Sequence, residues 1–149
     1  MIKLTEQVIY GFVKSCLVKN FDGSLETPKF HHELWDLFCS SNKYVAVAAP
    51  RSHAKSTAGT ISYGLACILF RNRRHVLVVS NTEEQAAAFV QEMRNIIADN
   101  EFIKTSFGLV IDDKNEVKFD TDSATEVVGR FTDGEQFRIV ANGRHTNSL

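Results

Sequence analysis

Residues 49–57 constrain this 149-residue chain more than any other segment. They follow an apolar run at residues 44–48 and lead into residues 56–70, whose composition favours a helix. An apolar strand, a tight loop, Lys-Ser-Thr and a helix follow one another in phosphate-binding P-loops. Backbone N–H groups and the positive end of the helix converge there on phosphate oxygens. The sequence therefore predicts such a loop, with Ala49 and Ala54 where the motif usually has glycine.

The side chains of this loop have separate expected roles. Lys55 would reach the β- and γ-phosphates of ATP, and the Ser56 hydroxyl would bind Mg²⁺ as the metal ligand. Arg51 lies inside the loop, where its forked guanidinium would contact phosphate oxygens during hydrolysis. Arg51 and Lys55 are therefore the predicted catalytic residues. The predicted nucleotide-binding residues are Ala49, Pro50, Arg51, Ser52, His53, Ala54, Lys55, Ser56 and Thr57.

A plainer interpretation of the same loop stays open. A strand-to-helix turn can contain Lys-Ser-Thr by chance, and an exposed His53 would then be simply solvated. If Ala54 has a positive φ, the strain is about 1–2 kcal/mol, whereas a negative φ removes it. The two alanines therefore leave room for a non-catalytic interaction module with a vestigial loop.

Composition narrows the class of protein. The chain is 44% hydrophobic and 23% charged, as expected for a globular domain, and no apolar stretch is long enough for a membrane span. Its net charge of −1 excludes a globally basic field, so any DNA contact must come from a local patch. Residues 71–75 are one candidate patch, although a solvated turn between a helix and a strand explains them as well.

The three cysteines fit a reducing compartment. Cys16, Cys39 and Cys67 are widely spaced, odd in number and form no Cys-x-x-Cys motif. They are expected to be small buried apolar residues rather than a disulfide framework or a metal site. A cytoplasmic location is therefore expected.

Periodicity predicts an α/β order of elements. Thr27 and Pro28 are expected to begin one helix, and Thr82 with Gln85 to form a capping box at another. Predicted helices span residues 5–19, 28–39, 56–70 and 83–100. Predicted strands span residues 44–48, 75–80, 116–119, 126–131 and 136–141. The expected architecture is a mostly parallel sheet flanked by helices.

Several stretches resemble the ATPase domain of tailed-phage terminase large subunits, the DNA-packaging motors. Residues 49–57 match the form Ala-Pro-Arg-x-x-Gly/Ala-Lys-Ser-Thr, and residues 30–35 look like the segment ahead of the loop that packs near the adenine. Residues 76–86 look like the second strand of that family and the start of its next helix. Phe107-Gly108 and residues 139–143 echo two later landmarks.

The resemblance implies an additional-strand, RecA-like P-loop ATPase core. It also implies that ATP hydrolysis drives viral double-stranded DNA into a procapsid, with a portal, a small terminase subunit and a homo-oligomeric ring as partners, and no membrane. Lys55 and Ser56 carry over as the phosphate and Mg²⁺ residues, and Arg51 as a loop arginine acting in cis on the γ-phosphate. The implied division is a helical segment at residues 1–27 and a partial ATPase domain at residues 28–149.

One catalytic element of that family is missing from its expected place. ATP hydrolysis needs a Walker B strand that ends in carboxylates, to hold Mg²⁺ and polarise water. Asp112 and Asp113 follow an apolar run, but Lys114-Asn115 come next, so these aspartates are expected in a hairpin turn. The chain is therefore expected to be an amino-terminal fragment that lacks Walker B and the nuclease domain and binds nucleotide without efficient hydrolysis. Two alternatives stay open: a complete ATPase that uses Asp112 and Asp113, and another RecA-like motor or helicase ATPase.

Overall fold

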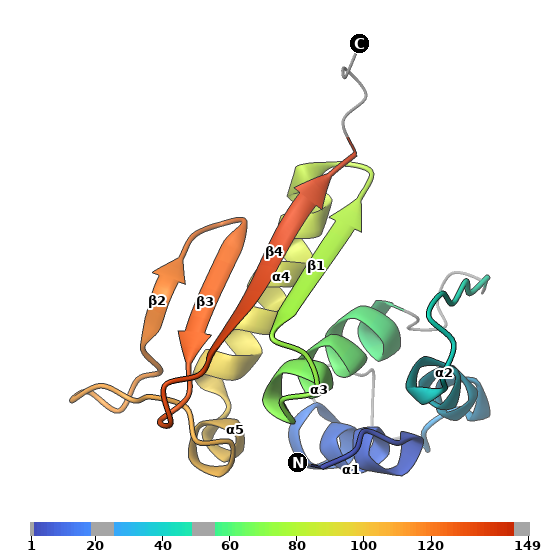
Figure 1. Ribbon diagram of the computed structural model, residues 1–149, viewed down its shortest axis with the longest axis horizontal. Helices are drawn as coiled ribbons and strands as arrows, with labels where there is room; N and C mark the ends of the chain where they lie inside the picture. The colour runs from blue at the N-terminus through green and yellow to red at the C-terminus, as the bar shows by residue number, and fades with distance from the viewer. Residues whose placement is uncertain (1, 19–25, 49–55, 145–149) are drawn as a thin grey trace. The chain divides into compact units, whose positions relative to one another are not determined.

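The computed structural model describes residues 2–18, 26–48 and 56–144 of the chain. Contacts within the chain divide it into two compact units, Met1–Asn72 and Arg73–Leu149. The first unit is helical and the second is built on a sheet (Figure 1). Within the described residues, no helix is long and apolar enough to cross a membrane.

The described residues of the first unit form helical segments. They are α1 (Glu6–Cys16), α2 (Lys29–Cys39), the π-helix η2 (Thr57–Tyr63) and α3 (Gly64–Leu69), which continues η2. The Thr5 hydroxyl accepts a hydrogen bond from the Val8 amide and caps α1, which confirms the predicted first helix. The second predicted helix is also confirmed, but Pro28 is its N-cap and makes no side-chain capping bond.

Apolar faces of these helices form the core of the first unit. Its fully buried side chains include Ile9, Leu17, Trp35, Ile61 and Leu65. The predicted burial of Cys16 and Cys67 is confirmed, whereas Cys39 is half-buried. Burial raises the pKa of the Cys16 and Cys39 thiols to about 11, because a thiolate loses solvation there.

The second unit consists of a mixed sheet and two helices. In chain order these are β1 (His75–Ser80), α4 (Glu83–Asp99), α5 (Glu101–Ser106), β2 (Phe119–Asp122), β3 (Glu126–Arg130) and β4 (Gln136–Gly143). The described strands are ordered β1-β4-β3-β2 in one sheet. β1 pairs with β4 in parallel, whereas β4 with β3 and β3 with β2 are antiparallel. The α/β class is thus confirmed, but the expectation of a mostly parallel sheet is wrong for these strands, because tight turns join β2, β3 and β4.

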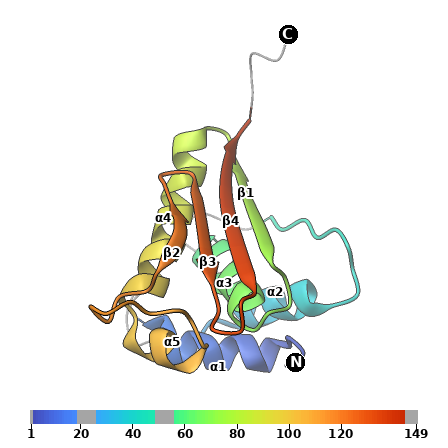
Figure 2. The same cartoon turned by 60° about the vertical axis from the view of Figure 1, so that its left-hand side comes forward.

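Helix α4 lies along one face of this sheet (Figure 2). Val90, Met93 and Ile97 are fully buried on α4, as are Val127 and Ile139 on the sheet. The two predicted strands at residues 75–80 and 126–131 and the helix at residues 83–100 are confirmed within a residue or two. The strand predicted at residues 116–119 instead begins at Phe119, and α5, capped by Asn100, was not predicted.

The start of α4 confirms half of the predicted capping box. The Thr82 hydroxyl accepts a hydrogen bond from the Gln85 amide at 3.2 Å. The Gln85 side chain does not complete the box, because its oxygen accepts a hydrogen bond from the Ser80 hydroxyl at 3.0 Å. Gly143 at the end of β4 lies against this helix start, and a Cβ there would be 2.5 Å from the Glu83 nitrogen. Glycine therefore lets β4 end directly beside α4.

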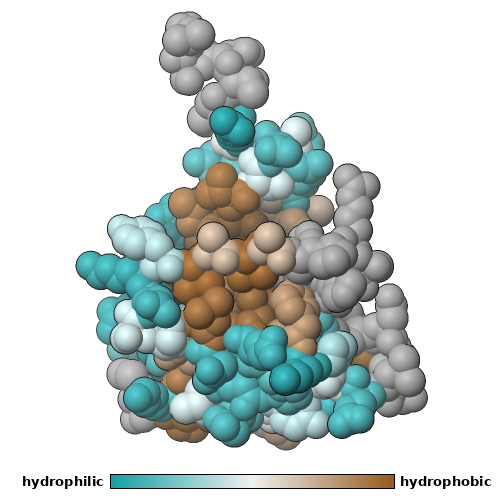
Figure 3. All heavy atoms as spheres, turned by 90° about the vertical axis from the view of Figure 1, so that its right-hand side faces the viewer, coloured by the Kyte–Doolittle hydropathy of each residue, from teal (hydrophilic) through white to brown (hydrophobic). Residues whose placement is uncertain are grey.

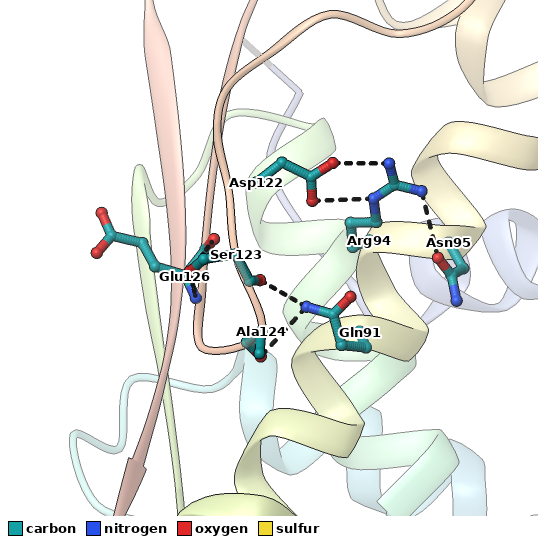
Figure 4. A network of polar contacts seen from close by, with 7 residues as sticks. All are labelled: Gln91, Arg94, Asn95, Asp122, Ser123, Ala124 and Glu126. Atoms are coloured by element: carbon teal, nitrogen blue, oxygen red, sulfur yellow. Dashed lines mark hydrogen bonds and ion pairs between the residues drawn. The ribbon is translucent and has the colours of Figure 1, made fainter.

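A polar network fastens the β2–β3 hairpin to α4 (Figure 4). The Arg94 guanidinium donates two hydrogen bonds to the Asp122 carboxylate, at 3.1 and 2.7 Å, and lies over the Phe119 ring. The bond from Arg94 to Asp122 raises the pKa of the Arg94 guanidinium. The Gln91 amide nitrogen donates to the carbonyl oxygens of Ser123 and Ala124. This helix and hairpin are thus joined by a bidentate ion pair as well as by apolar packing.

The other face of the sheet is divided between polar and apolar side chains. Asp120 accepts hydrogen bonds from Gln136 at 2.7 Å and from Arg130 at 3.2 Å, and these bonds lower the pKa of its carboxyl group. On β1, Leu77 and Val79 are 61% and 60% exposed. Figure 3 shows a hydrophobic area of the molecular surface with hydrophilic residues above and below it.

Candidate nucleotide-binding site

Most of the predicted phosphate loop lies outside the described residues. This holds for the predicted catalytic residues Arg51 and Lys55 and for five of the predicted nucleotide-binding residues, Ala49, Pro50, Ser52, His53 and Ala54. Ser56 and Thr57, the last two residues of the motif, are described. The geometry of the site is therefore given by its carboxyl-terminal end and by the elements that support this end.

Ser56 and Thr57 are the first described residues of a long helical segment. Ser56 has helical backbone angles, with φ −71° and ψ −39°, and is exposed. η2 begins at Thr57 and passes into α3, so the helical residues continue to Leu69. This confirms the helix predicted at residues 56–70. A helix start has amide groups without intrahelical acceptors and a positive partial charge, which are the features that favour a bound phosphate.

The helical residues Thr57–Tyr63, directly after Ser56, have the wide π register. In a π-helix the backbone N–H of each residue bonds the carbonyl five residues earlier, instead of four as in an α-helix. Two side chains reach the carbonyls at the start of this turn: the Ser62 hydroxyl donates to the Thr57 oxygen at 2.7 Å, and the Trp35 indole N–H donates to the Ala58 oxygen at 2.8 Å. Trp35, Ala58 and Ser62 are all completely buried.

The segment predicted to pack near an adenine, residues 30–35, lies within α2. Later in α2, the Phe38 ring lies 5.0 Å from the Tyr63 ring, and the Tyr63 hydroxyl donates to the Phe38 carbonyl at 3.3 Å. A Cβ on Gly59 would lie 3.4 Å from the Phe38 ring, so glycine allows close contact at this point. α2 is therefore packed directly against the helix that follows the loop.

The strand expected before the loop is not formed. Residues 44–48 belong to no helix or strand, and Tyr44 is 92% exposed. The prediction of a strand here is wrong for the described structure, because an apolar run forms a strand only when another strand pairs with its backbone. Of the predicted strand and helix on either side of the loop, the described structure therefore contains the helix but not the strand.

Asp112 and Asp113 lie in a turn, as the sequence predicted. The Asp112 carboxylate accepts hydrogen bonds from the amides of Lys114 and Glu116 at 2.9 and 3.0 Å. Asn115 has a φ of 63°, which is a turn conformation that asparagine tolerates. An aspartate used in this way closes a hairpin, so this geometry supports a structural role rather than a Walker B role for the pair.

The arginine-rich segment lies in a turn between a helix and a strand, as the plainer of its two interpretations predicted. Residues 70–74 connect α3 to β1 without forming a helix or strand, and Arg71 has a φ of 61°. Arg74 donates to the Glu135 carboxylate at 2.9 Å, and its carbonyl accepts from the Arg138 amide at 2.7 Å. At least part of this charge is thus neutralised by ion pairing.

No group of three or more His, Cys, Asp or Glu side chains placed to hold a metal ion occurs among the described residues. The predicted Mg²⁺ ligand, Ser56, contributes a hydroxyl oxygen, which suits this hard cation. In P-loop sites the nucleotide phosphates supply further oxygen ligands, so one protein hydroxyl fits such a site.

The sequence did not predict the hydrogen bonds of Trp35, which lies in the segment at residues 30–35, or of Ser62. A tryptophan on an apolar helix face is expected in the core, and its buried N–H is expected to find an acceptor. Nothing in the local pattern shows that this acceptor is Ala58, 23 residues later. The Ser62 contact depends on the π register, which periodicity does not predict.

Comparison with known proteins does not assign the chain to a family. No protein-family model, no curated protein and no solved structure matches it.

Proposed function

We propose that this chain is the ATP-binding part of a DNA-packaging motor of the terminase type, with a RecA-like P-loop fold. The supporting observation is that Ser56, which directly follows Lys55 of the motif, is exposed and helical and is the first described residue of a long helical segment. In a P-loop, amide groups and the positive end of the helix dipole at this side of the helix meet the phosphates. Helix geometry and loop sequence thus favour the same ligand at the same place.

Each loop side chain has a proposed task. Lys55 neutralises the β- and γ-phosphates, and Ser56 contributes its hydroxyl to Mg²⁺, which bridges the same phosphates when bound. Arg51 contacts the γ-phosphate with its planar fork. Thr57, half-buried at the first turn, supports the α-phosphate side. This division assigns none of the loop side chains to activation of the attacking water.

The placement of Asp112 and Asp113 supports a limited activity. The Asp112 carboxylate closes a hairpin turn. We therefore assign neither carboxylate of this pair to Mg²⁺ binding or to the polarisation of water in the proposed site. We therefore propose nucleotide binding without efficient hydrolysis for this chain. Complete turnover, together with double-stranded DNA, a portal, a small terminase subunit and a ring of copies, belongs to the proposed whole motor.

A non-catalytic interaction module is the second candidate. The observation that favours it is residues 44–48, which lie outside any sheet although a P-loop normally follows a paired strand. In this candidate the loop is vestigial and has no ligand. ATP with Mg²⁺ would then leave the thermal stability of the protein unchanged, since no binding free energy adds to the folded state.

Titration with a fluorescent ATP analogue, with and without Mg²⁺, tests the proposed function. Wild type should bind saturably, and Lys55→Ala should weaken binding about tenfold or more, because a charged contact to phosphate is lost. Ser56→Ala should reduce the Mg²⁺ dependence of binding. Lys118→Ala, which removes an exposed lysine on the second unit, is the matched control and should bind like wild type.

The outcomes separate the parts of this proposal. Absence of binding by wild type, or equal binding by wild type and Lys55→Ala, would contradict a nucleotide site at residues 49–57. A phosphate-release assay on the same samples should stay near background. Rapid release by wild type would contradict the proposal that the hydrolytic site is incomplete.

A further inference from the structure

We propose that Trp35 and Ser62 are positioning residues that hold the helix after the loop in its π register and so place Ser56 and Thr57 for phosphate binding. This inference rests on the proposed nucleotide site and adds a specific device to it. Neither side chain touches the ligand in this proposal. Each acts through one backbone carbonyl of η2: Trp35 through that of Ala58, and Ser62 through that of Thr57.

The π register itself calls for a cause. π-Helices are rare and short, and they occur often at functional sites. η2 nevertheless has seven residues in this register and then passes into the regular helix α3. Something outside the backbone must therefore favour the wider turn at Thr57–Tyr63 over an α-helical turn of the same sequence.

The Trp35 indole supplies one such contact. It is fully buried, and its N–H donates to the Ala58 carbonyl at 2.8 Å. The Trp35 ring also contacts the rings of His31 and His32, whose centroids lie 5.9 and 5.7 Å away. If the Ala58 carbonyl moved away, the buried indole N–H would lose its hydrogen bond, and water could not replace the lost acceptor. This cost holds the Ala58 carbonyl in place.

Ser62 supplies the second contact, and its spacing is specific for the wide turn. Its hydroxyl donates at 2.7 Å to the carbonyl of Thr57, five residues earlier. In an α-helix, serine side chains bond carbonyls three or four residues earlier. The Ser62 contact therefore stabilises the π register relative to the α register.

A change of register would move the loop end of the helix. One residue corresponds to about 1.5 Å of rise and about 100° of rotation in an α-helix. Ser56 and Thr57 would change direction by a comparable amount relative to the part of the helix fixed by α2. A shift of this size at phosphate-binding groups weakens their alignment with the ligand.

Two variants and one matched control test the inference in the full chain. Trp35→Phe removes the indole N–H, and Ser62→Ala removes the hydroxyl. Tyr63→Phe removes a hydrogen bond at the same helix contact, but one whose acceptor is the Phe38 carbonyl on α2. The readouts are melting temperature, affinity for a fluorescent ATP analogue with Mg²⁺, and NMR couplings across hydrogen bonds, which show whether the Ser62 amide bonds Thr57 or Ala58.

All three variants should melt earlier than wild type. Only Trp35→Phe and Ser62→Ala should bind nucleotide more weakly, by about two- to tenfold, as expected for loss of one hydrogen bond. In both, the coupling from the Ser62 amide should move from Thr57 toward Ala58. Tyr63→Phe should keep wild-type affinity and the Thr57 coupling.

Two results would overturn the inference. One is wild-type affinity in both Trp35→Phe and Ser62→Ala, and the other is an unchanged Thr57 coupling in both. If wild type binds no nucleotide, the proposed function fails, whereas the NMR couplings still decide whether these two side chains set the register. Failure of the function and failure of the inference are thus distinguishable.

Discussion

Residues 44–48 and β1 are two apolar runs of similar character with different structures. Both precede a helix, and both were predicted to be strands from the same kind of pattern. β1 pairs in parallel with β4 along its whole length, from His75 to Ser80. Residues 44–48 pair with no strand, and Tyr44 is almost completely exposed.

An apolar segment therefore forms a strand when a second strand pairs with its backbone, and its own sequence is not sufficient. β1 is a strand because β4 is held in place by α4, by β3 and by the close approach of Gly143 to Glu83. Its own side chains are not well buried, since Leu77 and Val79 are largely exposed.

The largest effect is expected from Phe137→Ala. The Phe137 ring on β4 is 1% exposed, and a Cβ added at Gly129 would clash with it, so the ring is tightly enclosed. Its removal should lower the free energy of unfolding by about 3–5 kcal/mol. Chemical denaturation measures the loss, and hydrogen exchange should show β1 losing protection together with β4. Retained protection of β1 would contradict the dependence of one strand on the other.

Gly143→Ala should destabilise the second unit by about 1–3 kcal/mol, because the backbone of Glu83 cannot easily move away from the added methyl group. Gly11→Ala in α1 is the matched control. No atom lies within 4 Å of a Cβ at Gly11, so alanine there should stabilise the protein by about 0.5–1 kcal/mol. Thermal melts of both variants check the opposite signs. Equal shifts would argue against the close contact at Gly143.

Arg94→Gln should cost about 1 kcal/mol, because it breaks the bidentate pair with Asp122 on the hairpin. The control is Arg74→Gln, which breaks the more exposed pair with Glu135 and should cost less than about 0.5 kcal/mol. Urea denaturation at low and high salt compares the two. A larger loss from the Arg74 variant would contradict the role of the network in Figure 4.

The smallest effect concerns the first unit and appears only at high pH. The pKa of Cys39 is raised from 9.0 to about 11, mainly by burial, so the unfolded chain ionises first. The contribution of this thiol to the free energy of unfolding is fully present below pH 9 and decreases as the pH rises toward 11. Cys39→Ala should therefore make the fall in stability between these pH values shallower. An identical pH profile of denaturation for wild type and variant would contradict the shift.

The sequence correctly predicted features that depend on residues close together in the chain, such as helix starts and turns. Thr5 and Thr82 marked helix starts correctly, and Asp112 with Asn115 marked a turn. It did not predict pairing between distant strands, so residues 44–48 were wrongly assigned and the antiparallel part of the sheet was missed. At the candidate site it predicted the helix after the loop. It missed the Trp35 contact, which joins residues far apart in the chain, and the π turn at Thr57–Tyr63, which hydrophobic periodicity does not predict.

The central claim is that residues 49–57 bind ATP with Mg²⁺, and hydrogen exchange with and without this ligand tests it most directly. We expect slower exchange in peptides covering residues 49–63, little change in peptides covering β2, β3 and β4, and no effect of the ligand on Lys55→Ala. Unchanged exchange at residues 49–63 under saturating ATP and Mg²⁺, or the same protection in Lys55→Ala, would contradict the claim.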